Sequence, residues 1–176
     1  TCVTNVNFDK KAVDAITTQV QSEKNRLAAE AGISAAADLP LGGVWTDNED
    51  IRSLKSLILF GLRGMAAYAY HARVLGKTDE RIDGFFVKAL AALATESSVD
   101  TLLSLTLEVG EVNLICMGLL DGANTGAYGT PTPTEVTLTV ESGPFIVVSG
   151  HDLRDLETIL KQTESKGINV YTHGEM

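Results

Sequence analysis

Two polar side chains near the C-terminus have the types and the placement of metal ligands. His151 follows the apolar, β-branched run at residues 145–149, which predicts a strand buried on both faces, and Glu175 follows a second extended segment at residues 168–172. An imidazole nitrogen and a carboxylate oxygen together suit iron, zinc or manganese. Two donors do not complete a metal site, so a simpler interpretation stays open, in which His151 decorates a helix start and Glu175 is a solvated end.

The residues between them predict a helix that crosses from one strand to the next. Asp152 can accept backbone N–H groups of the first turn, and Gly167 suits the left-handed conformation that ends a helix. Apolar residues recur between these two positions at helical spacing: Leu153, Leu156, Ile159 and Leu160. A crossover helix of this kind makes the two strands parallel.

Parallel strands would bring the polar residues to one edge of the sheet. Both carboxyl ends open onto the same edge, where ligands bind in open α/β folds. We therefore expect His151 and Glu175 to lie one or two strand spacings apart, each of about 5 Å. His173 is a candidate to line the same pocket or to orient a ligand through a hydrogen bond.

Long motifs cover most of the chain: NVNFD (5–9), EDIRSLKSLILFGLRGMAAYAYHARVLG (49–76), VGEVNLICMGLLDGANTGAYGTPTPTEV (109–136) and SGHDLRDLETILKQTESKGINVYTHGEM (149–176). Together they closely resemble the hybrid cluster protein family, whose members are also called prismane proteins and hydroxylamine reductases. The resemblance is weakest across residues 33–48, where Pro40 and the pair Gly42–Gly43 predict a loop.

This resemblance implies a cofactor and two of its ligands. In the family, the histidine of GHDL and the glutamate of THGEM bind an iron–sulfur–oxygen hybrid cluster of the 4Fe-2S-2O type, and these positions are His151 and Glu175 here. The remaining family ligands are cysteines and a second glutamate further downstream, and a second iron–sulfur cluster is held by N-terminal cysteines. Because only Cys2 and Cys116 are present, we interpret the chain as an internal fragment that binds neither cluster alone and is inactive.

The resemblance also implies an activity for the parent protein. It would be an oxidoreductase that reduces hydroxylamine to ammonia and water, or reduces nitric oxide, with electrons from a donor protein. A nickel–iron carbon monoxide dehydrogenase, which has a related fold and a different cluster, is the alternative within catalysis. A third interpretation is a helical interaction module without chemistry of its own.

Composition limits the class of protein. The chain has 176 residues, of which 44% are hydrophobic and 21% charged, as in soluble globular domains. A net charge of −9 and an aromatic content of 6% argue against binding to nucleic acid. We expect no membrane span, because even the apolar stretch at 54–70 is interrupted by Lys55 and Arg63. Two well-separated cysteines form no disulfide framework, which favours the cytoplasm.

Periodicity predicts a mainly α-helical bundle followed by the start of an α/β domain with a Rossmann-like parallel sheet. Residues 1–128 form the bundle region, with helices at about 8–31, 49–75, 79–95 and 98–120. The first helix would end one three-helix bundle, and the other three would form a second, antiparallel up-down-up bundle. Residues 129–176 would contain a linker strand at 136–140 and the first βαβ unit of a truncated domain. Its open sheet edge predicts self-association.

Several single residues have structural interpretations. Cys116 is expected to be a small core residue, and Trp45 to cover the bundle. Glu108 is expected on a solvated stripe. Gly61 and Gly64 each cost about 1 kcal/mol of helix propensity, which predicts the close approach of a neighbouring helix.

Overall fold

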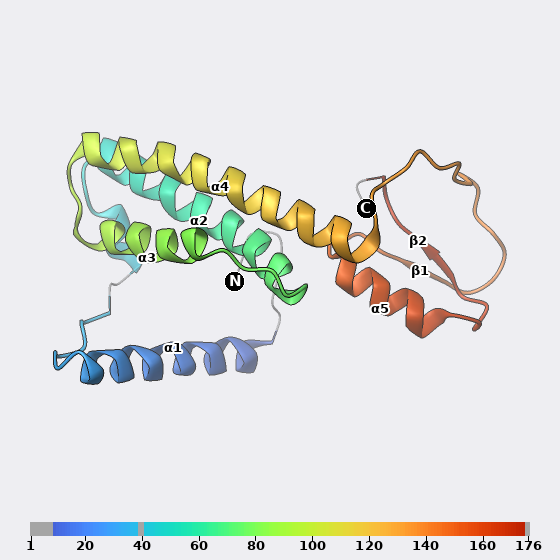
Figure 1. The fold of residues 1–176 in the computed structure, drawn as a ribbon, viewed down its shortest axis with the longest axis horizontal. Coiled ribbons are helices and arrows are strands. Elements are labelled where there is room, and N and C mark those ends of the chain that lie inside the picture. Colours follow the sequence, from blue (N-terminus) through green and yellow to red (C-terminus); the bar gives the residue numbers. More distant parts are fainter. Residues whose placement is uncertain (1–8, 39–40, 175–176) are drawn as a thin grey trace. The chain divides into compact units, whose positions relative to one another are not determined.

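The computed structural model describes residues 9–38 and 41–174. The described chain contains five α-helices, one 3₁₀ helix and two strands (Figure 1). It divides into two compact units, Thr1–Asp121 and Gly122–Met176. This architecture confirms the predicted order of a helical bundle followed by the start of an α/β domain.

Helix α1 spans Lys10–Glu30 and starts where the sequence predicts. The Asp9 carboxylate accepts hydrogen bonds from the backbone N–H groups of Lys11 and Ala12, so it caps the first turn. The apolar stripe of α1 is thin, and Ile16 and Val20 are 58% and 61% exposed. The helix is therefore not stabilised by deep burial of its apolar face.

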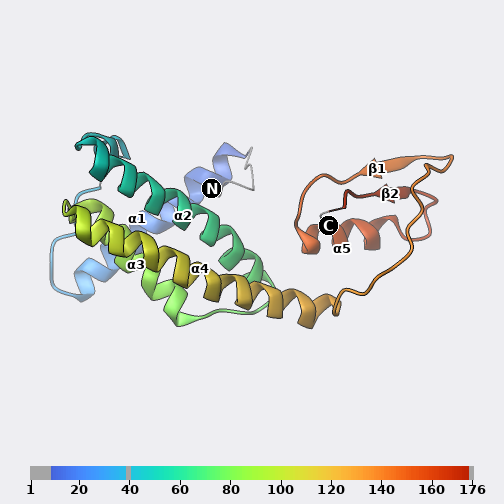
Figure 2. The ribbon, with the colours of Figure 1, turned by 90° about the horizontal axis from the view of Figure 1, so that it is seen from above.

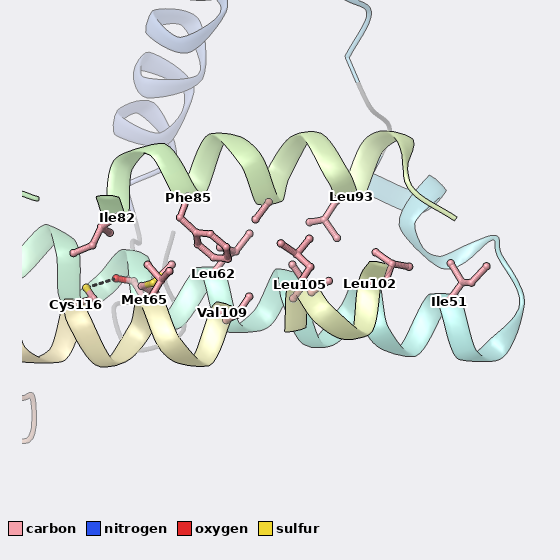
Figure 3. Packing of buried hydrophobic residues seen from close by; sticks show 13 residues of the cluster. Ile51, Leu62, Met65, Ile82, Phe85, Leu93, Leu102, Leu105, Val109 and Cys116 are labelled. Atoms are coloured by element: carbon pink, nitrogen blue, oxygen red, sulfur yellow. Dashed lines mark hydrogen bonds between the residues drawn. The ribbon is translucent and has the colours of Figure 1, made fainter. Parts of the chain in front are cut away.

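Three helices form the antiparallel bundle: α2 (Glu49–Val74), α3 (Glu80–Thr95) and α4 (Val99–Tyr128). Their facing side chains make one hydrophobic core, shown in Figure 3. The largest fully buried side chains are Ile58, Met65, Ile82, Leu102 and Cys116, and they come from all three helices. The predicted three- and four-residue spacing is what places these side chains on the inner faces.

The predicted close approach holds at one glycine and fails at the other. A Cβ atom on Gly61 would lie 2.8 Å from Cγ1 of Val109, so α2 and α4 approach closely at that point. A Cβ atom on Gly64 would meet nothing within 4 Å. The prediction for Gly64 was therefore wrong, since no described residue approaches that position closely.

A short 3₁₀ helix, η1 (Leu41–Trp45), lies against α2 within the segment predicted as a loop. Val44 is 2% exposed, and the indole Nε1 of Trp45 donates a hydrogen bond of 2.8 Å to Oγ of Ser56. The ammonium of Lys55 is buried and pairs with Asp47 at 2.8 Å. These contacts confirm that Trp45 belongs to a cover over the bundle.

The linker between the bundle and the sheet differs from prediction in two ways. Helix α4 continues to Tyr128, beyond the expected end near residue 120, and Gly129 ends it with a φ of +90°. The glycines at 122–129 are thus tolerated in the last turns, since no proline interrupts them before residue 131. The strand predicted at 136–140 does not form: Leu138 there is 94% exposed and finds no strand partner among the described residues.

The predicted βαβ unit is present. Strand β1 (Phe145–Val147) pairs in parallel with β2 (Asn169–Tyr171), and α5 (Leu153–Thr163) connects them along one side of the pair (Figure 2). Gly167 has the expected left-handed conformation, with a φ of +65°, but it does not end the helix, because α5 already ends at Thr163. The prediction that β1 is buried on both faces was wrong, because Phe145 and Val147 are 64% and 67% exposed. Helix α5 covers only one face of this two-stranded sheet.

Candidate metal-binding edge of the βαβ unit

The position of His151 is fixed by the elements on either side of it. It lies between the carboxyl end of β1 and the start of α5, and its side chain is exposed. The next residue, Asp152, accepts hydrogen bonds from the backbone N–H groups of Arg154 and Asp155 at 2.9 and 3.1 Å. This N-cap anchors the turn that carries His151, as the sequence predicts.

The parallel pairing brings the ends of the two strands together. Val147 is opposite Tyr171, and one residue later the N–H of Val148 donates to the carbonyl oxygen of Tyr171 at 2.8 Å. Residues 149–151 and 172–174 therefore leave the sheet from the same edge. This is the geometry in which open α/β folds bind ligands.

Two histidines meet at this edge. The ring centroids of His151 and His173 lie 4.8 Å apart with an interplanar angle of 61°, an edge-to-face contact. The Nε2–H of His173 donates to the carbonyl oxygen of Ser149 at 3.2 Å. The structure thus places His173 beside His151, whereas the sequence pattern identified it only as a candidate for a supporting role.

The second predicted ligand, Glu175, lies outside the described residues. Its convergence with His151 therefore remains a prediction, although β2 ends at Tyr171 and the chain after it reaches the shared edge at His173. Residues 9–38 and 41–174 contain no cluster of three or more histidine, cysteine, aspartate or glutamate side chains that could hold a metal ion. An imidazole nitrogen is a donor of the chemical type that suits an iron centre.

The cysteine in the described part of the chain does not contribute to this edge. Cys116 lies in the bundle core with no exposed surface, and its Sγ–H donates to the carbonyl oxygen of Met65 at 3.6 Å. Burial raises the pKa of the Cys116 thiol, which disfavours the thiolate that a metal or an electrophile requires. Cys116 is a core residue, as predicted.

The structure also shows the partner of the acidic residue Glu108 on α4. Its carboxylate pairs with the ammonium of Lys88 on α3 at 2.6 Å, and the side chains remain partly exposed. This is a surface ion pair between neighbouring helices and confirms the solvated interpretation of Glu108. Such a pair contributes about 0–1 kcal/mol to stability.

Two features of the described chain had no clear signal in the sequence. A groove of about 830 Å³ runs along α5 and β2, lined in part by Leu156, Leu160, Ile168 and Val170. Neither His151 nor His173 lines it, so the groove is separate from the histidine edge. The spacing of the α5 residues predicts an apolar face, but not whether another element covers it.

Helix α4 is the other feature. By length and composition it is the one helix in the described residues that could cross a membrane, whereas the sequence predicted none. The expectation missed it because it considered the apolar stretch at 54–70 and overlooked the apolar residues of the helix expected at about 98–120. The same helix supplies Leu102, Leu105 and Cys116 to the bundle core, and core helices of soluble proteins pass the same test.

Known proteins resemble the chain along its whole length. The Prismane/CO dehydrogenase family matches residues 1–176. A hydroxylamine reductase of Desulfovibrio desulfuricans is 49% identical over 169 residues, which cover 96% of this chain and 30% of the relative. One from Thermodesulfovibrio yellowstonii is 55% identical over 131 residues, which cover 74% of this chain and 24% of the relative.

A third hydroxylamine reductase, from Desulfitobacterium hafniense strain Y51, is 43% identical over 197 residues, which cover 99% of this chain and 36% of the relative. The chain therefore spans about a third of the length of these relatives, or less. The match of the family to all 176 residues agrees with the resemblance inferred from the motifs, and the chain belongs to the Prismane/CO dehydrogenase family.

Proposed function

We propose that this chain supplies the helical bundle and the first βαβ unit of a hybrid cluster oxidoreductase. The proposed reaction is the reduction of hydroxylamine to ammonia and water, which consumes two electrons and two protons. Nitric oxide is the other small nitrogenous substrate that the family resemblance implies. The names of the relatives support the first reaction, and a separate donor protein would supply the electrons.

We further propose that His151 and Glu175 are ligands of the hybrid cluster. The observation that carries this proposal is the parallel pairing of β1 and β2, which directs residues 149–151 and 172–174 to one edge. His151 would bind iron through a neutral imidazole nitrogen and Glu175 through an ionised carboxylate. When bound, the cluster supplies electrons and an iron position for the nitrogen substrate.

The chain's own residues would set the geometry of these ligands. The Asp152 cap holds the turn between β1 and α5, and the ladder bond from Val148 to Tyr171 holds the two strand ends together. An exposed His151 is accessible to further protein layers and to a cofactor. These contacts fix the backbone from which both ligands extend.

The alternative within the same family is a nickel–iron carbon monoxide dehydrogenase. The family description includes both classes, whereas the relatives described above are hydroxylamine reductases. Metal analysis of the full-length holoprotein separates the two: iron without nickel is expected here, and stoichiometric nickel would favour the dehydrogenase.

The 176-residue chain is proposed to be inactive when it is purified alone. Within the described residues β1 and β2 pair only with each other, so their outer edges offer backbone hydrogen-bonding groups to a second copy, and we propose that the chain self-associates. Light scattering over a range of concentrations tests this, and a monomer at every concentration would contradict it. Iron and sulfide analysis tests the first statement, because a stoichiometric iron–sulfur chromophore in the purified chain would refute it.

The ligand proposal is tested in a full-length family member that carries this sequence in its matching region. His151→Ala and Glu175→Gln are each expected to remove the hybrid-cluster signal from the electron paramagnetic resonance spectrum and to abolish turnover, while the second cluster survives. The matched control is His71→Ala on α2, a histidine whose ring contacts Tyr70 instead. Retention of the hybrid-cluster signal in either ligand variant would contradict the assignment.

A further inference from the structure

His173 connects the two segments that leave the sheet at the histidine edge. Its Nε2 lies 3.2 Å from the carbonyl oxygen of Ser149, and its ring lies edge-to-face against His151. Ser149 is two positions before His151, whereas His173 follows β2. A single side chain therefore contacts both the backbone before His151 and the ring of His151 itself.

We propose that His173 is a positioning residue that holds the His151 imidazole in a defined orientation at the carboxyl edge of the sheet. The inference deepens the proposed function and rests on it in one respect, which is that the oriented imidazole of His151 is an iron ligand. We call the hydrogen bond from His173 to Ser149 and the ring contact between His173 and His151 the His173 brace. It involves only residues that the structure describes: Ser149, His151 and His173.

The hydrogen bond fixes which ring nitrogen of His173 carries the proton. A carbonyl oxygen can only accept, so Nε2 of His173 must carry the proton. A metal ligand requires a lone pair on the coordinating nitrogen, which a protonated Nε2 does not offer. The Nε2 atom of His173 is thus committed to the carbonyl group of Ser149, and this hydrogen bond holds the His173 ring beside the ring of His151.

The hydrogen bond between His173 and Ser149 restrains the backbone segment that contains His151. Beyond Val147, the described ladder continues with the bond from Val148 N–H to Tyr171 O. The His173 side chain adds a cross-connection one residue further along, at Ser149. It limits the motion of the short segment between the last ladder bond and the Asp152 cap, which contains His151.

The ring contact adds a second restraint. An edge-to-face pair at 4.8 Å places the two imidazoles within the range where aromatic rings prefer this arrangement. Because the hydrogen bond fixes the His173 ring, the His151 ring packs against a surface of defined position. Orientation of a ligating histidine by neighbouring groups is a common way to fix the ligand geometry of metal sites.

Variants at position 173 separate the hydrogen bond from the ring contact. His173→Phe keeps an aromatic ring and removes the Nε2–H donor, whereas His173→Gln removes the ring and keeps an N–H donor of similar reach. His71→Phe is the matched control, because His71 lies on α2 and its ring contacts Tyr70. All variants are made both in the 176-residue chain and in the full-length holoprotein.

Nuclear magnetic resonance of the ¹⁵N-labelled chain tests the brace without any metal. We expect His173 to carry its proton on Nε2, and nuclear Overhauser effects to connect the rings of His151 and His173. In His173→Phe, exchange of the Val148 amide hydrogen is expected to rise about 2- to 12-fold, the range that the loss of one net hydrogen bond supports. His173→Gln is expected to restore the exchange rate of the wild-type chain.

Other results in the chain would overturn the brace. A proton on Nδ1 alone, with Nε2 unprotonated, would exclude the hydrogen bond to Ser149. An unchanged exchange rate of the Val148 amide hydrogen in His173→Phe would show that the hydrogen bond to Ser149 does not restrain the strand ends. If His173→Phe unfolds the βαβ unit, recovery of the unit in His173→Gln supports the brace, and failure to recover overturns it.

The holoprotein tests whether the brace serves the iron ligand. His173→Phe is expected to shift the g-values of the hybrid cluster and to lower its occupancy, with substantial rescue by His173→Gln and no change in the second cluster. Unaltered g-values in His173→Phe would overturn the positioning role. If the wild-type holoprotein contains no hybrid cluster, the proposed function fails, and the measurements on the chain alone then decide whether His173 still holds His151.

Discussion

The contact between Gly61 and Val109 allows a quantitative test of the bundle. Replacing Gly61 by alanine would place a Cβ atom 2.8 Å from Cγ1 of Val109, closer than two carbon atoms can approach. Val109 is 8% exposed, and its branched side chain has one strongly preferred rotamer in a helix. The clash can therefore be relieved only by strain in Val109 or by separation of α2 from α4.

The magnitude follows from two opposing effects. Overpacking of a core costs about 1–3 kcal/mol, whereas glycine to alanine inside a helix gains about 1 kcal/mol. Gly61→Ala is therefore expected to lower the free energy of unfolding by about 0–2 kcal/mol. Gly64→Ala, in the same helix with nothing within 4 Å, should instead raise it by up to about 1 kcal/mol.

The difference between the two variants isolates the steric contact, because both gain the same helix propensity. Urea unfolding followed by the fluorescence of the single tryptophan, Trp45, is a suitable assay, since its indole donates to Ser56 on α2 and reports on the bundle. In a Val109→Ala background, Gly61→Ala should become stabilising. If Gly61→Ala stabilises the wild-type chain as much as Gly64→Ala does, α2 and α4 do not approach as described.

Three further predictions concern the other unit, the cover of the bundle and a titrating carboxylate. Asp152→Ala should cost about 1 kcal/mol of α5 stability while Asp152→Asn retains the cap, and amide exchange in the first turn of α5 measures both. Asp47→Ala should cost about 1–3 kcal/mol, because it leaves the buried ammonium of Lys55 without its carboxylate. A smaller loss in Lys55→Met, compared by Trp45 fluorescence, would separate the unpaired charge from lost packing. Hydrogen bonds from the side chain and the backbone N–H of Arg81 lower the pKa of Asp79 to about 2. The stability from this carboxylate is therefore present above its ordinary pKa of about 4 and is lost as the pH falls toward 2, which a ¹³C carboxyl titration of wild type and Arg81→Ala tests.

Local signals in the sequence were sufficient for the helices that begin at a capping residue and for the left-handed turn at Gly167. Asp9 and Asp152 cap α1 and α5, and Gly167 precedes β2, because hydrogen bonding and backbone conformation at these positions depend on nearby residues. The antiparallel bundle follows from apolar spacing and short connections. The parallel sheet follows from the helix that joins its strands.

The errors arose where the outcome depends on contacts distant in the sequence. Alternation at 136–140 predicts a strand, but a strand requires a partner, and Leu138 has no strand partner among the described residues. Gly61 and Gly64 look alike in the sequence, and only the packing of α4 distinguishes them. Apolar side chains on β1 predict burial, yet only α5 covers the sheet.

The candidate site shows the same division. Strand and helix order predicts that His151 lies at the carboxyl edge, and the structure confirms this position. The edge-to-face contact with His173 and the hydrogen bond to Ser149 depend on side-chain orientation beyond the last ladder bond, which periodicity does not encode. Proximity of His173 to the end of β2 was the signal available.

The most direct measurement of the central claim is pulsed electron paramagnetic resonance on full-length holoprotein labelled with ¹⁵N-histidine. We expect a ¹⁵N hyperfine coupling to the hybrid cluster that persists in His173→Gln, whereas His151→Ala should remove the coupling together with the signal of the cluster. A coupling that survives the loss of His151, or one that disappears only when His173 is replaced, would contradict the assignment of His151 as the iron ligand at this edge.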